Sequence, residues 1–274
     1  MADRHRVGLI VPSSNVTMET ELPALLGEYG ADRRFTFHSS RAVLHRVDAE
    51  SLRRMVGESD RCAAELADAR VEVVAYACLV AVMAEGAGAH DAHEARLTDR
   101  LRAAGCDAPV VSSAGALVRT LQELDAHRVA MIAPYMKPLT AKVAAYLEAY
   151  GFDVIDSLSL EVDDNLAVGA LDPSRLVDHL GRVRTDGADA VILSACVQMP
   201  SLEALQPAAD AVGLPVISAA SSTARELLAH FGIDATLPGA QPSRAEVAAG
   251  SSAYDVAVAS SSRTARGRPR TTSS

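Results

Sequence analysis

The feature of this sequence that most constrains its fold is a regular alternation of short apolar segments with longer helical stretches. The stretches between the apolar segments are rich in Ala, Leu, Glu and Arg at helical spacing. Strands and helices in alternation indicate right-handed β-α-β units and parallel sheets with helices on both faces. The predicted strands, rich in Val and Ile, are residues 6–12, 35–39, 71–77, 109–112, 128–134, 152–156, 189–195 and 215–218.

The eight predicted strands form two sets of four with similar sequences in the same order. Residues 6–12 (RVGLIVP) correspond to 128–134 (RVAMIAP), at an offset of 122 residues. Residues 109–112 (PVVS) correspond to 215–218 (PVIS), at an offset of 106 residues. Between these pairs, one strand ends in Tyr-Ala-Cys and its counterpart ends in Ser-Ala-Cys. Three matches in one order indicate an internal duplication.

The duplication predicts an α/β protein of two similar lobes, each with a four-stranded parallel sheet flanked by helices. We expect an N-terminal lobe over residues 1–127 and a C-terminal lobe over residues 128–258, related by a pseudo-twofold axis. Ligands of open α/β sheets bind beyond the carboxyl ends of the strands. The active site is therefore expected in the cleft between the lobes, among the loops that follow the strands.

Composition excludes several classes of protein. The chain has 274 residues, a formal net charge of -9 and no apolar run that approaches the roughly 18 residues of a membrane-spanning helix. Residues 259–274 carry four Arg and no acid, so we expect a disordered, dispensable basic tail rather than a nucleic-acid-binding arm. Four well-separated cysteines predict reduced thiols in the cytoplasm.

Two of the four cysteines are candidates for catalysis. Cys78 and Cys196 follow equivalent strands, at an offset of 118 residues, and each is expected to lead directly into a helix. A helix N-terminus stabilises a thiolate and lowers the pKa of the thiol. Cys62 and Cys106 are expected to be buried structural residues. The repeat therefore predicts that Cys78 and Cys196 face one another across the cleft as the catalytic pair.

Three segments resemble the maleate cis-trans isomerases of the aspartate/glutamate racemase superfamily. They are VGLIVPSSNVTMETELP at residues 7–23, YACLVA at 76–81 and SACVQMPS at 194–201, and the resemblance extends to about Phe231. It implies a reaction that needs neither metal nor cofactor. Cys78 would add to C2 of maleate, rotation about C2–C3 would follow, and elimination would give fumarate.

The resemblance also implies which side chains bind the substrate. Asn15, Tyr135 and Asn165 match the family's carboxylate-binding residues. We expect Ser14 to cap a helix or to bind a carboxylate. Neutral donors of this kind suit the negative charge that develops during addition. Leu79-Val80 and Val197-Gln198 follow the two cysteines, and Val80 and Val197 are expected to form an apolar wall against the carbon skeleton.

Other candidate sites carry weaker signals. His90 and His93 lie in GAHDAHEAR, which lacks the His-Glu-x-x-His spacing and is typical of a helix start rather than of a metal site. Gly86-Ala87-Gly88 does not directly follow a strand and is not a dinucleotide-binding loop. Ser13 and Ser14 lack a nucleophile elbow. Lys137 and Arg225 could attract a dianion but are expected to be exposed charges.

Three functions remain open from the sequence. The first is maleate isomerase. The second is a racemase or decarboxylase of the same superfamily that acts on another small dicarboxylate or amino acid. The third is a noncatalytic carboxylate-binding protein. In each case the partner is a small dicarboxylate rather than nucleic acid or membrane, and a homodimer or higher homo-oligomer is usual for such folds.

Overall fold

The computed structural model describes residues 3–30 and 33–240, and these contain two four-stranded parallel sheets. The first sheet has the strand order β2-β1-β3-β4 and the second has the order β6-β5-β7-β8, so the two sheets repeat one topology. The strands are β1 (Asp3–Pro12), β2 (Arg33–Ala42), β3 (Val73–Tyr76), β4 (Val110–Ser112), β5 (Arg128–Ala133), β6 (Asp153–Ser159), β7 (Ala190–Ser194) and β8 (Val216–Ser218).

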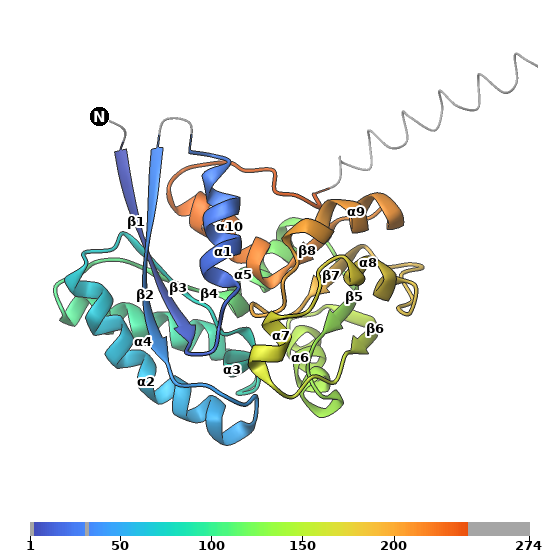
Figure 1. Ribbon diagram of the computed structural model, residues 1–274, viewed down its shortest axis with the longest axis horizontal. Coiled ribbons are helices and arrows are strands. Elements are labelled where there is room, and N and C mark those ends of the chain that lie inside the picture. Colours follow the sequence, from blue (N-terminus) through green and yellow to red (C-terminus); the bar gives the residue numbers. More distant parts are fainter. Residues whose placement is uncertain (1–2, 31–32, 241–274) are drawn as a thin grey trace, which may run out of the picture. The chain divides into compact units, whose positions relative to one another are not determined.

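Helices connect the strands and cover the sheets. On the first sheet, α2 and α4 pack against one face, whereas α1 and α10 pack against the other (Figure 1). On the second sheet, α6 packs against β6, and α9 packs against β8 and α8. The helices of the described residues are α1 (Met18–Gly27), α2 (Ala49–Asp68), α3 (Leu79–Met83), α4 (Ala89–Ala103), α5 (Ser113–Glu123), α6 (Lys137–Ala149), α7 (Asn165–Gly169), α8 (Arg175–Leu180), α9 (Leu202–Val212) and α10 (Ala219–His230).

Local sequence explains where several elements begin and why the central strands are buried. Every residue of β3 and β7 is buried, as expected for apolar strands with helices on both faces. Asp48 caps α2 by accepting hydrogen bonds from Glu50 N and Ser51 N. Ser112 and Ser218, at the equivalent ends of β4 and β8, cap α5 and α10 in the same way.

The fold class predicted from the sequence is confirmed, since all eight predicted strands are present in two parallel sheets. The last helix adds a connection between the halves. α10 follows β8 in sequence but also contacts α1, α5, β3 and β4 of the first half. None of the described helices is long and apolar enough to cross a membrane. The expected tail at residues 259–274, and the end of the expected second lobe after residue 240, lie outside the described residues.

Candidate active site

The loop after β1 and the loop after β7 meet at the carboxyl ends of the two sheets. Asn15 Nδ2 donates a hydrogen bond to Val197 O at 3.2 Å, and Thr17 Oγ1 donates to Gln198 O at 2.6 Å. Asn15 Oδ1 accepts from Thr17 N at 3.0 Å and from Met18 N at 2.9 Å, where α1 begins. The start of α1 therefore fixes the Asn15 side chain, which reaches across to the second half of the chain.

Asn165, in the second half of the chain, contacts the loop after β1. It is the first residue of α7, which Asp164 caps by accepting from Leu166 N and Ala167 N. Asn165 Nδ2 donates to Ser14 Oγ at 2.8 Å, and Ser14 Oγ in turn donates to Leu44 O. Because an amide nitrogen carries two hydrogens, an asparagine can hold its protein partner and still donate to a substrate.

The two candidate thiols interact electrostatically. Cys78 directly precedes α3 and is 3% exposed, and Cys196 lies just beyond β7 and is 5% exposed. Burial raises the pKa of Cys78 to about 12, the Ala81 amide opposes this rise, and the nearby charge of Cys196 adds to it. The two sulfurs are thus close enough that ionisation of one disfavours ionisation of the other.

Tyr135 completes a group of three with the two cysteines. Its side chain is buried at the end of β5 and hydrogen-bonds to Cys196. Burial raises the pKa of Cys196, whereas the hydrogen bond from Tyr135 and the amides of Gln198 and Met199 lower it. Burial and the two thiols raise the pKa of Tyr135, so the phenol stays protonated and can act as a donor.

The surroundings of the thiols correct one expectation from the sequence. Both thiols were predicted to lead into a helix that lowers their pKa, but burial outweighs the amide hydrogen bonds and raises the pKa of each. α3 has only five residues, so its dipole is small. Cys196 does not lead directly into a helix, because α9 begins at Leu202. The neutral thiol is therefore the stable form in this closed site.

The predicted substrate-binding residues are almost completely shielded from solvent. Only Ser14 among them is partly exposed, and its hydroxyl bonds Leu44 and Asn165 rather than capping α1. Val80 in α3 and Val197 beside Cys196 are both buried, next to the thiols they follow. The buried residues, none more than 5% exposed, are Asn15, Cys78, Val80, Tyr135, Asn165, Cys196 and Val197. A ligand can reach this site only if the loops move apart.

Sequence reasoning did not single out Gln198 as a functional residue. Its Nε2 donates to Ser14 O at 2.9 Å and to Asn165 O at 2.8 Å, and its Oε1 accepts from Val16 N at 3.0 Å. The backbone N–H of Gln198 lies 3.4 Å from Cys196 Sγ. One signal was available, since Gln198 is a polar residue inside the otherwise apolar segment that follows Cys196.

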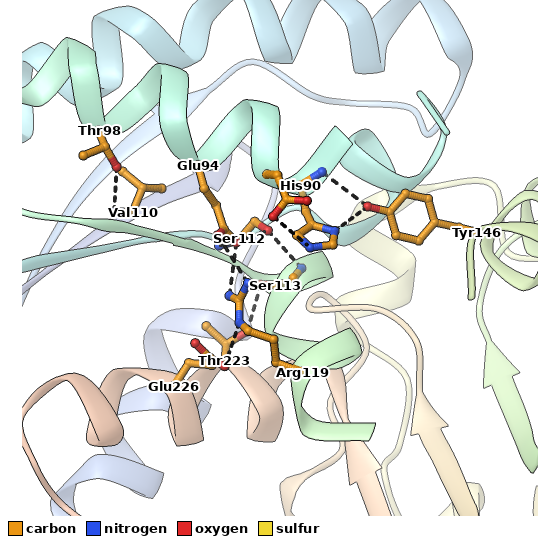
Figure 2. Close-up of polar contacts among 12 residues, drawn as sticks. His90, Glu94, Thr98, Val110, Ser112, Ser113, Arg119, Tyr146, Thr223 and Glu226 are labelled. Atoms are coloured by element: carbon orange, nitrogen blue, oxygen red, sulfur yellow. Dashed lines mark hydrogen bonds and ion pairs between the residues drawn. The ribbon is translucent and has the colours of Figure 1, made fainter. Parts of the chain in front are cut away.

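The histidines of α4 have partners other than a metal. His90 Nδ1 lies 2.7 Å from Tyr146 Oη (Figure 2), and His93 Nε2 lies 2.9 Å from Glu85 Oε2. Within residues 3–30 and 33–240, no group of three potential ligands is arranged to hold a metal ion. Lys137 is exposed and pairs with Glu161, whereas Arg225 is partly buried and pairs with Glu123.

Comparison with known proteins identifies relatives of the whole described unit. The family model for arylmalonate decarboxylase matches residues 7–242. The maleate isomerase of Alcaligenes faecalis is 55% identical over 239 residues, which cover 86% of this chain and 94% of that protein.

Two solved structures are similar to this one, each with a TM-score of 0.84 over 86% of this chain and 96% of the other. One is a cysteine-to-alanine variant of the maleate isomerase Iso from Pseudomonas putida S16 with maleate, which is 48% identical. The other is a cysteine-to-serine variant of the Nocardia farcinica maleate cis-trans isomerase with a covalently bound succinylcysteine intermediate, which is 46% identical.

Proposed function

Because the chain belongs to the maleate isomerase family, we propose that Cys78 is the nucleophile and Cys196 its partner in converting maleate to fumarate. The enzyme is a cis-trans isomerase that acts through a cysteine. The observation that supports the residue assignment is the pair of buried thiols at equivalent strand ends, close enough to influence one another's ionisation.

The reaction requires that the double bond of maleate become single for a time. The Cys78 thiolate adds to C2, the S–C2 bond forms, and the π electrons move to C3 and onto the carboxylate attached to it. Rotation about the C2–C3 single bond is then free. Re-formation of the double bond expels the thiolate and leaves fumarate, so the enzyme returns to its starting state.

Neutral donors suit this sequence of steps. The charge that develops on the carboxylate beside C3 needs donors that already point toward it. Asn15 and Asn165 have their amides oriented by contacts with Val197 and Ser14, and Tyr135 is held as a protonated phenol. We assign the binding of the two carboxylates to these three side chains together with Ser14. Val80 and Val197 are assigned to the wall against the carbon skeleton.

Formation of the thiolate is the energetically demanding step. With a pKa of about 12, ionising Cys78 at pH 7 costs about 7 kcal/mol. This cost already includes the lowering of the pKa by the Ala81 amide. Cys196 accepts a hydrogen bond from Tyr135 and can donate its own proton toward C3 of the substrate, which gives it the role of an acid. A proton added at C3 must be removed again before the thiolate leaves.

The proposal includes the cellular setting and assembly of the enzyme. We assign it to the cytoplasm, as a homodimer or higher homo-oligomer that needs no cofactor. The four cysteines are all free thiols, which suits a reducing compartment. Most soluble oligomers are homo-oligomers with closed symmetry, and C2 dimers are the most common of these. Sedimentation equilibrium of the full-length protein distinguishes a dimer from a monomer.

Mapping the covalent adduct tests the assignment. Purified enzyme with Cys196→Ser is mixed with maleate, quenched in acid and digested, and the peptides are analysed by mass spectrometry. We expect a succinyl adduct to accumulate on the peptide that contains Cys78, because the serine slows the proton transfer that precedes product release. Cys106→Ser serves as the control. Cys106 donates to Val71 O, before the start of β3 and therefore at the other end of this strand from Cys78, and a serine can keep that bond.

Three outcomes would contradict the proposal. An adduct on Cys196 of the wild-type enzyme with none on Cys78 would reverse the two roles. No turnover of maleate by wild type, together with turnover of aspartate, glutamate or phenylmalonate in the same panel, would favour a racemase or decarboxylase instead. Tight binding of maleate without any product would favour a carboxylate-binding protein.

A further inference from the structure

We propose that Gln198 is a positioning residue whose side-chain amide fixes the two substrate-binding asparagines against the Cys196 loop. The two asparagines, which come from different halves of the chain, are thereby held in one fixed arrangement. This inference rests on the proposed function, because it concerns how that site is assembled. Gln198 is not assigned to contact maleate. It is assigned to hold the residues that do.

The amide of Gln198 brackets Asn15. It accepts from the N–H of Val16, the residue after Asn15, and donates to the carbonyl of Ser14, the residue before it. Both ends of the Asn15 peptide segment are therefore held by one side chain. Because the amide group is rigid and planar, these two contacts fix the direction as well as the position of the segment.

The same amide holds Asn165 directly. Gln198 Nε2 donates its second hydrogen to Asn165 O, at 2.8 Å. The loop after β1 and the start of α7 come from different halves of the chain, and this nitrogen joins them. The backbone of the same residue contacts Cys196 Sγ and accepts from Thr17 Oγ1. Gln198 is thus bonded to both asparagine-bearing segments and to one catalytic thiol.

The interior leaves no room for a different arrangement of this amide. Gln198 is 2% exposed. Gly169, at the end of α7, lies against it: a Cβ atom at this position would lie 2.6 Å from Gln198 Nε2 and 2.7 Å from Val16 Cγ2. The backbone of α7 approaches this closely only because residue 169 has no side chain. Position 169 therefore offers a way to disturb the amide without changing Gln198.

The first experiment replaces the amide with an apolar group of similar shape. Gln198→Met removes all three side-chain hydrogen bonds and leaves the backbone contacts in place. We expect kcat/KM for maleate to fall about 100-fold, the loss typical of a misplacement of about 1 Å in a catalytic geometry. Most of the loss should appear in kcat. Maleate can still bind to the carboxylate-binding side chains, but its C2 atom is misaligned with the sulfur of Cys78. Gln122→Met, at an exposed position of α5, is the matched control and should leave kcat/KM unchanged.

The second experiment displaces the same amide through a substitution at the neighbouring position 169. Gly169→Ala should push Gln198 and Val16 aside and lower kcat/KM at least 10-fold while the protein stays folded. Gly57→Ala is its control, because a Cβ atom there meets nothing within 4 Å. If Gln198→Met fails to fold, Gly169→Ala decides the question alone.

A double-mutant cycle separates positioning from a purely structural role. If Gln198 acts through Asn165, adding Gln198→Met to Asn165→Ala should lower kcat/KM by much less than it does in wild type. If the fold-loss in kcat/KM of the double variant equals the product of the losses of the two single variants, the inference is overturned. A kcat/KM within threefold of wild type in both Gln198→Met and Gly169→Ala would overturn it as well. In either case wild-type turnover of maleate leaves the proposed function intact, whereas a wild type that does not turn over maleate removes both.

Discussion

At the scale of single residues, the two thiols occupy equivalent places in the two sheets but have different neighbours. Cys78 has one amide donor, from Ala81, and burial raises the pKa of its thiol to about 12. Cys196 has the phenol of Tyr135 and two amides as donors. Its three donors suit Cys196 to proton transfer. Cys78 has fewer hydrogen-bond donors around its sulfur, so this sulfur is freer to form a bond with carbon.

This difference predicts unequal effects of the two serine substitutions. Cys78→Ser should lower kcat by several orders of magnitude, because a hydroxyl with no adjacent base cannot replace a thiolate in conjugate addition. Cys196→Ser should lower kcat by a factor on the order of 10² to 10⁴, since serine still donates a hydrogen bond. Steady-state kinetics with maleate measures both, and KM should change little. Near-normal turnover by the Cys78→Ser enzyme would contradict the assignment.

The raised pKa of Cys78 predicts the pH dependence of its alkylation. Only the thiolate reacts, and its fraction rises tenfold per pH unit as long as the pH lies below the pKa. We expect the rate at which iodoacetamide modifies Cys78 in the ligand-free enzyme to rise continuously from pH 7 to pH 10, without a plateau. Peptide mapping at each pH gives the rate for this one residue. A plateau near pH 8 would mean that the thiol pKa is not raised.

At the scale of elements, Glu21 ties the first half of the chain to the second. It lies in α1, yet its carboxylate accepts from Ser201 N at 2.5 Å and from Leu202 N at 2.8 Å, at the start of α9. Ser201 Oγ also donates to it, at 3.2 Å. One buried side chain thus caps a helix on the other sheet, and that helix follows directly from the Cys196 loop.

Burial raises the pKa of Glu21 even though three hydrogen bonds oppose the rise. A carboxyl group with a raised pKa in the folded state stabilises the fold fully below its unfolded pKa, and this contribution is lost as the pH rises through the folded pKa. The difference in unfolding free energy between wild type and Glu21→Gln should therefore favour wild type more at pH 4 than at pH 7.

Urea denaturation at the two pH values measures this difference. Glu21→Ala should lose about 2 kcal/mol at pH 7, because it leaves two buried N–H groups without partners. The loss should be larger at pH 4, because this variant also lacks the pH-dependent contribution of the carboxyl group. Glu28→Gln, at an exposed position just after α1, is the control and should show no such pH-dependent difference. A wild-type advantage that grows from pH 4 to pH 7 would contradict the raised pKa.

At the scale of the whole molecule, a second connection between the two halves involves none of the proposed site residues (Figure 2). Arg119 in α5 donates through Nε to Glu226 in α10 at 2.8 Å, and its two terminal nitrogens donate to Glu94 in α4 at 3.3 and 3.2 Å. Glu94 also accepts from Ser112 N and Ser112 Oγ. The guanidinium therefore lies between two partly buried carboxylates and holds α10 against the first half of the chain.

Arg119→Met should lower the free energy of unfolding by about 2 kcal/mol, because it leaves two neighbouring carboxylates without their shared cation. Turnover per folded enzyme should stay within threefold of wild type, since none of these residues belongs to the proposed site. Chemical denaturation and kinetics on the same sample test both statements. Arg225→Met, which removes a more exposed pair with Glu123, should cost less than about 1 kcal/mol.

The composition of the C-terminal segment predicts that residues 259–274 are dispensable. They contain four Arg and no large apolar residue, and the family model ends at residue 242. Truncation after Val258 should leave kcat/KM for maleate within twofold of the full-length value. A truncated enzyme that is folded by circular dichroism but has lost most of its turnover would show that the segment takes part in function.

The sequence by itself was sufficient to predict the fold and, through its resemblance to a known family, the reaction. The eight apolar segments and their order predicted both sheets, because a parallel strand buried on both faces must be apolar over its whole length. The repeat directed attention to Cys78 and Cys196, since both follow equivalent strands of the duplicated sheets. These inferences depend on local pattern and chain order, which a sequence contains in full.

Only the tertiary structure decided how the site is held and how its thiols ionise. The pKa of Cys78 depends on how completely neighbouring segments exclude water from the thiol. The sequence predicted a helix after Cys78, but it did not show that burial would raise the pKa by more than this short helix lowers it. The contacts of Gln198 and Glu21 join residues about 180 positions apart. Such contacts are set by the packing of one half of the chain against the other, and nothing in the local sequence of either partner specifies the distance between them.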